Sequence, residues 1–112
     1  MPFPRLYKLF FDALGNKNRI KILDALRGGP MSVSQLCRAT RLEQSHVSHN
    51  MCCLVTCGFV SVERRGRHRI YSMNGPITRK LFSLIDSHLK RYEDHFCECG
   101  VINKKGRVSR HE

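Results

Sequence analysis

In the first half of the chain, apolar residues recur every three or four positions, the spacing that places side chains on one face of an α-helix. The first such run ends at Gly15, and Asn16 is placed to cap the second, which ends at residues 28–30. A short third helix is expected from Ser32, and a fourth from residue 44 to a terminating Gly58. The apolar positions of these four helices are Leu6, Leu9, Phe10, Ala13 and Leu14, then Ile20, Ile22, Leu23, Ala25 and Leu26, then Val33, Leu36 and Cys37, then Val47, Met51 and Leu54.

After Gly58 the pattern changes to a period of two residues, which predicts strands over residues 59–63 and 68–73. Residues 65–67 form the expected hairpin tip, where Gly66 supplies the positive φ that such turns need. Pro76 suits the first turn of a long last helix. The apolar positions of that helix are Ile77, Leu81, Leu84, Ile85, Leu89, Tyr92 and Phe96.

Four helices, a two-stranded hairpin and a last helix give the order α-α-α-α-β-β-α, that of a mainly α winged helix-turn-helix. We expect residues 1–99 to form one DNA-binding and dimerisation domain. Residues 100–112 are polar and basic and are predicted to be a disordered tail. The first and last helices carry more apolar surface than one chain can cover, so a homodimer through them is expected.

Charge sets this chain apart from an ordinary globular domain. Twenty Lys and Arg residues against nine Asp and Glu residues give a net charge of +11, which points to a polyanionic partner; an inert basic surface is the alternative. The chain has no apolar run of ~18 residues for a membrane span, and residues 1–5 lack the apolar region of a signal peptide. We therefore expect a cytoplasmic protein, with no membrane partner and no small organic substrate, whose cysteines stay reduced.

Small hydrogen-bonding side chains occupy the outer face of the fourth helix. Gln44 can pair bidentately with adenine, and His49 is placed to bond a phosphate. The predicted DNA-contacting residues of this helix are Gln44, Ser45, His46, Ser48 and His49. A solvated helix face is the alternative interpretation of the same pattern.

Four arginines surround the hairpin turn, namely Arg64, Arg65, Arg67 and Arg69. They are expected to bring charge to the minor groove or the DNA backbone, although strand alternation can instead place Arg69 on a solvent face. Much of the affinity would then come from counterion release, so binding should fall steeply with salt.

The segment Gln44-Ser45-His46-Val47-Ser48-His49, the exit Gly58-Phe59-Val60 and the hairpin residues 65–71 together resemble the ArsR/SmtB family of metal- and redox-responsive repressors. The resemblance covers roughly residues 6–92. It implies a dimeric winged-helix repressor that leaves a double-stranded DNA operator when an inducer binds. One departure is Glu43, where the family usually has Ser or Thr; we expect its carboxylate to cap the helix and to lower affinity for phosphates.

Two pairs of cysteines are candidate metal ligands. Cys53 and Cys57 lie four residues apart on one stripe of the fourth helix, so both sulfurs can meet one ion, and Cys97 and Cys99 form a second pair near the end of the last helix. Three or four thiolates favour soft ions such as Cd(II), Pb(II), As(III), Cu(I) or Zn(II). By resemblance, Cys53 and Cys57 match the ligand pair in the recognition helix of the cadmium- and lead-sensing branch. That branch completes its site with a tail cysteine, a role open to Cys97 or Cys99.

Other roles for these thiols stay open. Cys37 is interpreted as core filler and Cys52 as incidental, while a thiol-redox switch could use the same four candidate ligands. His49 could join Cys53 and Cys57 in a zinc site, at the cost of its phosphate contact.

Two other functions are alternatives to an inducer-controlled repressor. A constitutive DNA-compacting module would show little sequence preference and no response to an inducer. An enzyme is not expected, because Cys53 and His49 lack a third orienting group. A second family metal site would need a ligand pair near residues 74–76, so Asp86 and His88 are not expected to form it.

Overall fold

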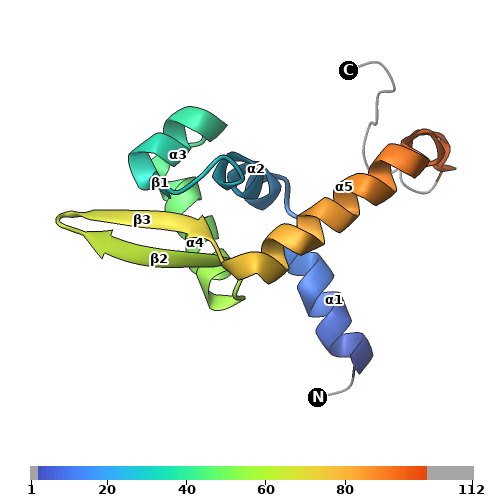
Figure 1. The fold of residues 1–112 in the computed structure, drawn as a ribbon, viewed down its shortest axis with the longest axis horizontal. Helices are drawn as coiled ribbons and strands as arrows, with labels where there is room; N and C mark the ends of the chain where they lie inside the picture. Colours follow the sequence, from blue (N-terminus) through green and yellow to red (C-terminus); the bar gives the residue numbers. More distant parts are fainter. Residues whose placement is uncertain (1–2, 101–112) are drawn as a thin grey trace. The chain divides into compact units, whose positions relative to one another are not determined.

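The computed structural model describes residues 3–100 of the chain (Figure 1). It consists of α1 (Phe3–Leu14), α2 (Lys17–Leu26), β1 (Met31–Ser32), α3 (Val33–Thr40), α4 (Gln44–Thr56), β2 (Val60–Arg65), β3 (His68–Met73) and α5 (Gly75–Glu98). This order confirms the predicted winged helix-turn-helix and adds one short strand. Contacts group the described residues into two compact units, which divide after Arg79. The predicted tail lies almost wholly outside the described residues.

Two of the helix starts have side-chain caps, and the cap at Asn16 confirms a prediction from the sequence. The Asn16 side-chain oxygen accepts hydrogen bonds from the backbone N–H groups of Asn18 and Arg19, at 2.9 and 3.1 Å. Ser32 and Gln35 form a reciprocal capping box at the start of α3. These bonds satisfy N–H groups that have no partner within their own helices.

The start of α4 corrects one prediction. Glu43 occupies the N-cap position with extended backbone, but its side chain makes no capping hydrogen bond. Short side chains such as Ser, Thr, Asp and Asn are preferred at this position because they reach the N–H groups of the first turn directly. The longer Glu43 side chain is exposed instead.

The core of the first unit lies between α2, α3, α4 and the sheet. Its largest fully buried side chains are Ile22, Leu23, Leu26, Leu36, Met51, Leu54, Val47 and Val60. From α1, only Ala13 is buried, and the Phe10 ring lies 5.2 Å from that of Phe59. Leu14 is half-buried, and the other apolar residues of α1 are exposed, as is Ile20 of α2 at 49%.

The sheet has the strand order β1-β3-β2 and is antiparallel throughout. β1, which the sequence analysis missed, pairs Met31 with Tyr71 and Ser32 with Ile70. β2 is longer than predicted and extends to Arg65, opposite His68. Gly66 turns the hairpin with φ of 62°, as predicted.

In the second unit, α5 continues from Lys80 to Glu98. His88, Tyr92 and His95 form a run of ring contacts along it, with centroids 4.8 and 5.7 Å apart. Between residues 3 and 100, no helix has both the length and the apolarity needed to cross a membrane.

Candidate nucleic-acid interface and thiol pair

The polar and apolar residues of α4 separate cleanly. Val47, Met51 and Leu54 are buried, as predicted, and Asn50 is buried beside them. The predicted DNA-contacting residues are all exposed, namely Gln44, Ser45, His46, Ser48 and His49. α4 therefore presents a continuous hydrogen-bonding surface to solvent from its first turn onward.

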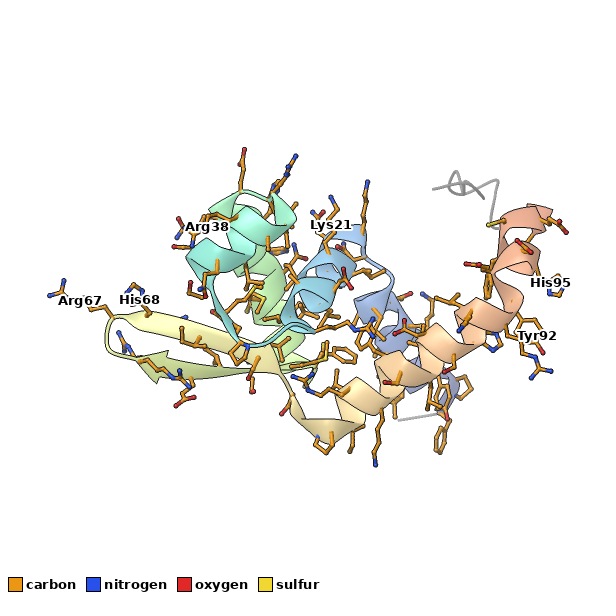
Figure 2. All side chains as sticks on the ribbon, turned by 45° about the horizontal axis from the view of Figure 1, so that its top comes forward. Lys21, Arg38, Arg67, His68, Tyr92 and His95 are labelled. Atoms are coloured by element: carbon orange, nitrogen blue, oxygen red, sulfur yellow. The ribbon has the colours of Figure 1, made fainter. Side chains whose placement is uncertain are left out.

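The hairpin arginines are also exposed, and Figure 2 shows Arg67 and His68 at the tip of the hairpin, away from the core. Arg64 and Arg69 are paired across β2 and β3, so their side chains share one face of the sheet. Like charges that face each other directly destabilise a sheet. Only Arg65 has a nearby carboxylate among the described ion pairs, Glu63 at 3.5 Å, and exposed pairs of this kind contribute little. An external anion would relieve the repulsion at Arg64 and Arg69.

A groove of about 440 Å³ separates α4 from the hairpin. Gln44, Ser48 and Cys52 line its helix side, at intervals of four residues, and Arg69 and Tyr71 belong to its hairpin side. Arg69 therefore shares a surface with two predicted DNA-contacting residues. Cys52 belongs to the same surface, a position that its spacing from Gln44 and Ser48 would have revealed.

The structure brings Cys53 and Cys57 together, with their sulfur atoms 4.0 Å apart. Cys53 is half-buried and Cys57, at the C-cap of α4, is exposed. Partial burial raises the pKa of the Cys57 thiol. The hydrogen bond to Cys53 and the charge of the Cys53 thiolate raise this pKa further, while the positive charge of Arg19 lowers it. Cys57 is thus protonated near neutral pH and is not an activated nucleophile.

Among its described residues, the first unit brings no other candidate ligand to the Cys53–Cys57 pair. Across the described residues, no group of three or more His, Cys, Asp or Glu side chains is arranged to hold a metal ion. His49, Cys53 and Cys57 do not form such a group, and the zinc alternative that uses His49 stays a prediction. In the second unit, Cys97 lies in the last turn of α5 and Cys99 just beyond its end, both half-buried.

The comparisons with known proteins agree with this geometry. The profile of the bacterial regulatory protein, arsR family, matches residues 16–62, from the start of α2 into β2. The crystal structure of Rv0081 from M. tuberculosis is similar with a TM-score of 0.79 and 30% identity, over 85% of this chain and 96% of that one. This chain belongs to the arsR family. The predicted resemblance is confirmed at the level of the family, while the cysteine-ligand branch stays a prediction.

Two relatives show what such proteins do. The transcriptional regulator NmtR of Mycobacterium tuberculosis is 43% identical over 61 residues, 54% of this chain and 51% of that protein. A probable mercury resistance operon repressor of Streptomyces lividans is 33% identical over 75 residues, 67% of this chain and 60% of its own length. The matches thus span about half of each relative or a little more. These relatives are transcription regulators, which confirms that the chain is not of an enzyme family.

The homodimeric winged helix-turn-helix domain Mb0332 of Mycobacterium bovis, described as a possible ArsR-family regulator, has a TM-score of 0.72 to this chain. It is 26% identical, and the match covers 85% of this chain and 93% of that one. The winged helix fold is therefore shared with a protein that forms a homodimer.

Proposed function

We propose that this protein is a cytoplasmic, homodimeric transcriptional repressor that a soft metal or metalloid ion releases from its DNA operator. The observation that carries the proposal is that one helix of 13 residues, α4, bears both the exposed polar surface and the Cys53–Cys57 pair. Binding of an ion to the two sulfur atoms would thus act on the helix that is proposed to contact DNA.

DNA recognition is assigned to α4 and the hairpin. In helix-turn-helix proteins the second helix of the motif enters the major groove with its N-terminal residues at the base edges, which here places Gln44 first. Ser45, His46, Ser48 and His49 follow along the groove, and the four hairpin arginines neutralise phosphates. A dimer would read two half-sites ~34–36 Å apart, about one helical turn.

The proposed dimer uses the exposed face of α1. Phe3, Tyr7 and Phe11 are 72, 56 and 61% exposed and contact one another in a row of aromatic rings. A contiguous exposed apolar surface of this kind marks an interaction site. A second copy of the chain is the proposed partner, as in the homodimeric neighbour.

The proposed inducer binds to Cys53 and Cys57, with Cys97 or Cys99 as a further ligand. Two sulfurs bound to one tetrahedral ion at ~2.3 Å stand about 3.8 Å apart, close to the 4.0 Å between Cys53 and Cys57. Thiolates select soft ions, so Cd(II), Pb(II), As(III), Cu(I) and Zn(II) are the candidates. The similarity to a probable mercury resistance repressor supports an ion of this class.

The decisive experiment measures fluorescence anisotropy of the reduced, anaerobic protein on DNA from upstream of its own gene, with and without Cd(II). We expect specific binding that is lost at stoichiometric Cd(II). Cys53→Ser and Cys57→Ser should bind DNA but not respond to Cd(II), whereas the neighbouring Cys52→Ser should respond like the wild type. Tight binding that ignores Cd(II) would exclude this inducer.

A redox-controlled repressor is the second candidate, because the 4.0 Å separation also suits reaction between the two thiols. It predicts that peroxide, and not Cd(II), releases the DNA, with full recovery after addition of a dithiol reductant. Indifference to both treatments, together with equal affinity for specific and random DNA, would support a constitutive DNA-binding module.

A further inference from the structure

A polar network joins three helices of the first unit at one side chain, Arg19 of α2. Its Nε donates to the side-chain oxygen of Asn50 at 3.2 Å, and its Nη1 donates to the backbone oxygen of Ala13 at 3.1 Å. Asn50, in the middle of α4, in turn donates from its Nδ2 to the backbone oxygen of His46 at 2.8 Å. We call this set of bonds the Arg19–Asn50 clamp.

The clamp satisfies polar groups that would otherwise lack hydrogen-bond partners. Asn50 is only 6% exposed and sits among the buried residues of α4, where a polar group without a partner costs about 1–3 kcal/mol. The Ala13 carbonyl belongs to the last turn of α1 and has no partner within that helix. Arg19 therefore satisfies both acceptors and ties the end of α1 to the centre of α4.

The clamp also lies next to both functional parts of α4, the half with the exposed polar residues and the cysteine pair. Through Asn50 it reaches the backbone of His46, in the half of α4 with the exposed polar residues. Asn50, Cys53 and Cys57 follow at intervals of three and four residues, which places them on adjoining parts of one side of the helix. Because Arg19 bonds to Asn50, three residues before Cys53, its guanidinium lies on the side of α4 that carries the sulfur pair, and its charge opposes the rise in the pKa of the Cys57 thiol.

We propose that Arg19 and Asn50 are positioning residues that hold α4 in its DNA-reading position, and that an ion on Cys53 and Cys57 acts by opening this clamp. The inference rests on the proposed function for its second half only. A thiol is a weak hydrogen-bond acceptor, whereas ion-bound sulfur has lost its proton and attracts N–H donors from surrounding residues. The Arg19 guanidinium can donate either to the sulfur atoms or to the oxygen atoms of Asn50 and Ala13. Its transfer to the sulfur atoms would release α4 from the clamp.

The test compares Arg19→Met with Lys21→Met. Both remove one positive charge from α2, but Lys21 is exposed and lies apart from the hairpin tip (Figure 2). Without any metal, we expect Arg19→Met to lose at least about tenfold in affinity for specific DNA relative to Lys21→Met. Affinity for random DNA should be equal in the two variants, because only the presentation of α4 differs.

Arg19→Lys guards against a trivial loss of folding, since it keeps the charge and the long stem but not the two-pronged geometry. It should fold with a circular dichroism spectrum like that of the wild type and show the same loss of specificity as Arg19→Met. Equal specific affinity of Arg19→Met, Arg19→Lys and Lys21→Met would overturn the positioning role, whatever the metal does.

The second half is tested with Cd(II) alone as the probe. Arg19→Lys should bind Cd(II) with the stoichiometry and thiolate-to-metal absorbance of the wild type, yet its remaining DNA affinity should change less than about threefold on loading. Release of DNA from Arg19→Lys by the same factor as from the wild type would refute the opening of the clamp. A wild type that keeps its DNA in Cd(II) would instead exclude Cd(II) as the inducer, and the opening of the clamp by Cd(II) with it.

Discussion

In the proposed complex with DNA, Gln44 and Arg67 have different chemical roles. The Gln44 amide can pair bidentately with one base, and such a pair discriminates by ~1–3 kcal/mol, while Arg67 offers a charge at the hairpin tip (Figure 2). We expect Gln44→Ala to reduce the ratio of specific to random affinity by about tenfold. Arg67→Ala should weaken both affinities by a similar factor and lower the salt slope by about one. Anisotropy titrations on matched specific and scrambled duplexes measure both quantities.

Gln44→Glu is a useful control for this division, because it keeps the shape of the side chain but removes the amide donor. It should lose the preference as Gln44→Ala does, with an added loss on all DNA from charge repulsion. Equal losses on both duplexes for Gln44→Ala and Arg67→Ala would contradict the assignment.

The raised pKa of the Cys57 thiol should make ion binding depend on pH. Its pKa is raised by partial burial and by Cys53, so at neutral pH a proton must leave before the sulfur binds an ion. Apparent Cd(II) affinity should therefore rise with pH, by about tenfold per unit for each thiol that is deprotonated. Competition titrations against a chelator of known pH dependence, between pH 6 and 8, measure this slope. It should be shallower in Cys57→Ser; a wild-type affinity independent of pH would show that these thiols are not the ligands.

At the scale of elements, the start of α4 is where this chain departs from a well-capped helix. Glu43 makes no capping bond, and its negative charge stands beside residues proposed to meet DNA. Glu43→Ser should stabilise the protein by about 0.5–1 kcal/mol by adding a cap and should strengthen DNA binding. Urea unfolding and anisotropy test these two effects.

Glu43→Gln separates the cap from the charge, since it removes the charge without offering a short capping side chain. It should strengthen DNA binding like Glu43→Ser but add no stability. A Glu43→Ser protein that is no more stable than Glu43→Gln would mean that the first turn of α4 needs no side-chain cap.

The helices could be predicted from sequence because each carries its own signals, such as Asn16 and Ser32 at helix starts and Gly58 after a helix end. β1 could not, because two residues have no period, and its strand character comes only from pairing with Tyr71 and Ile70. The same limit hid the Arg19–Asn50 clamp, which joins residues 31 positions apart. The Cys53–Cys57 contact, by contrast, follows directly from a spacing of four on a helix.

At the scale of the whole molecule, the net charge of +11 predicts how binding responds to salt. Each phosphate neutralised contributes about 0.9 to the slope of log affinity against log salt. With four hairpin arginines on each protomer of a dimer, we expect a slope of at least about 6 on the operator. The slope should fall when Arg64 and Arg69 are replaced together by Gln, a change that also removes like charges paired across the sheet. A slope near zero would exclude the phosphate contacts proposed for the hairpin.

The last prediction concerns assembly through α1. Phe11 is 61% exposed and packs its ring against Phe10, at 5.4 Å, and Tyr7, at 6.5 Å, so its outer face contributes little to the core of its own chain. A charge placed there should be tolerated by the folded monomer but not by an apolar interface with a second copy. We expect Phe11→Asp to sediment as a monomer at micromolar concentration, where the wild type is a dimer. Its helical circular dichroism should be unchanged, and its affinity for a two-half-site operator should fall to that for a single half-site. A Phe11→Asp protein that remains dimeric, or a wild type that is monomeric, would show that this face of α1 is not the interface.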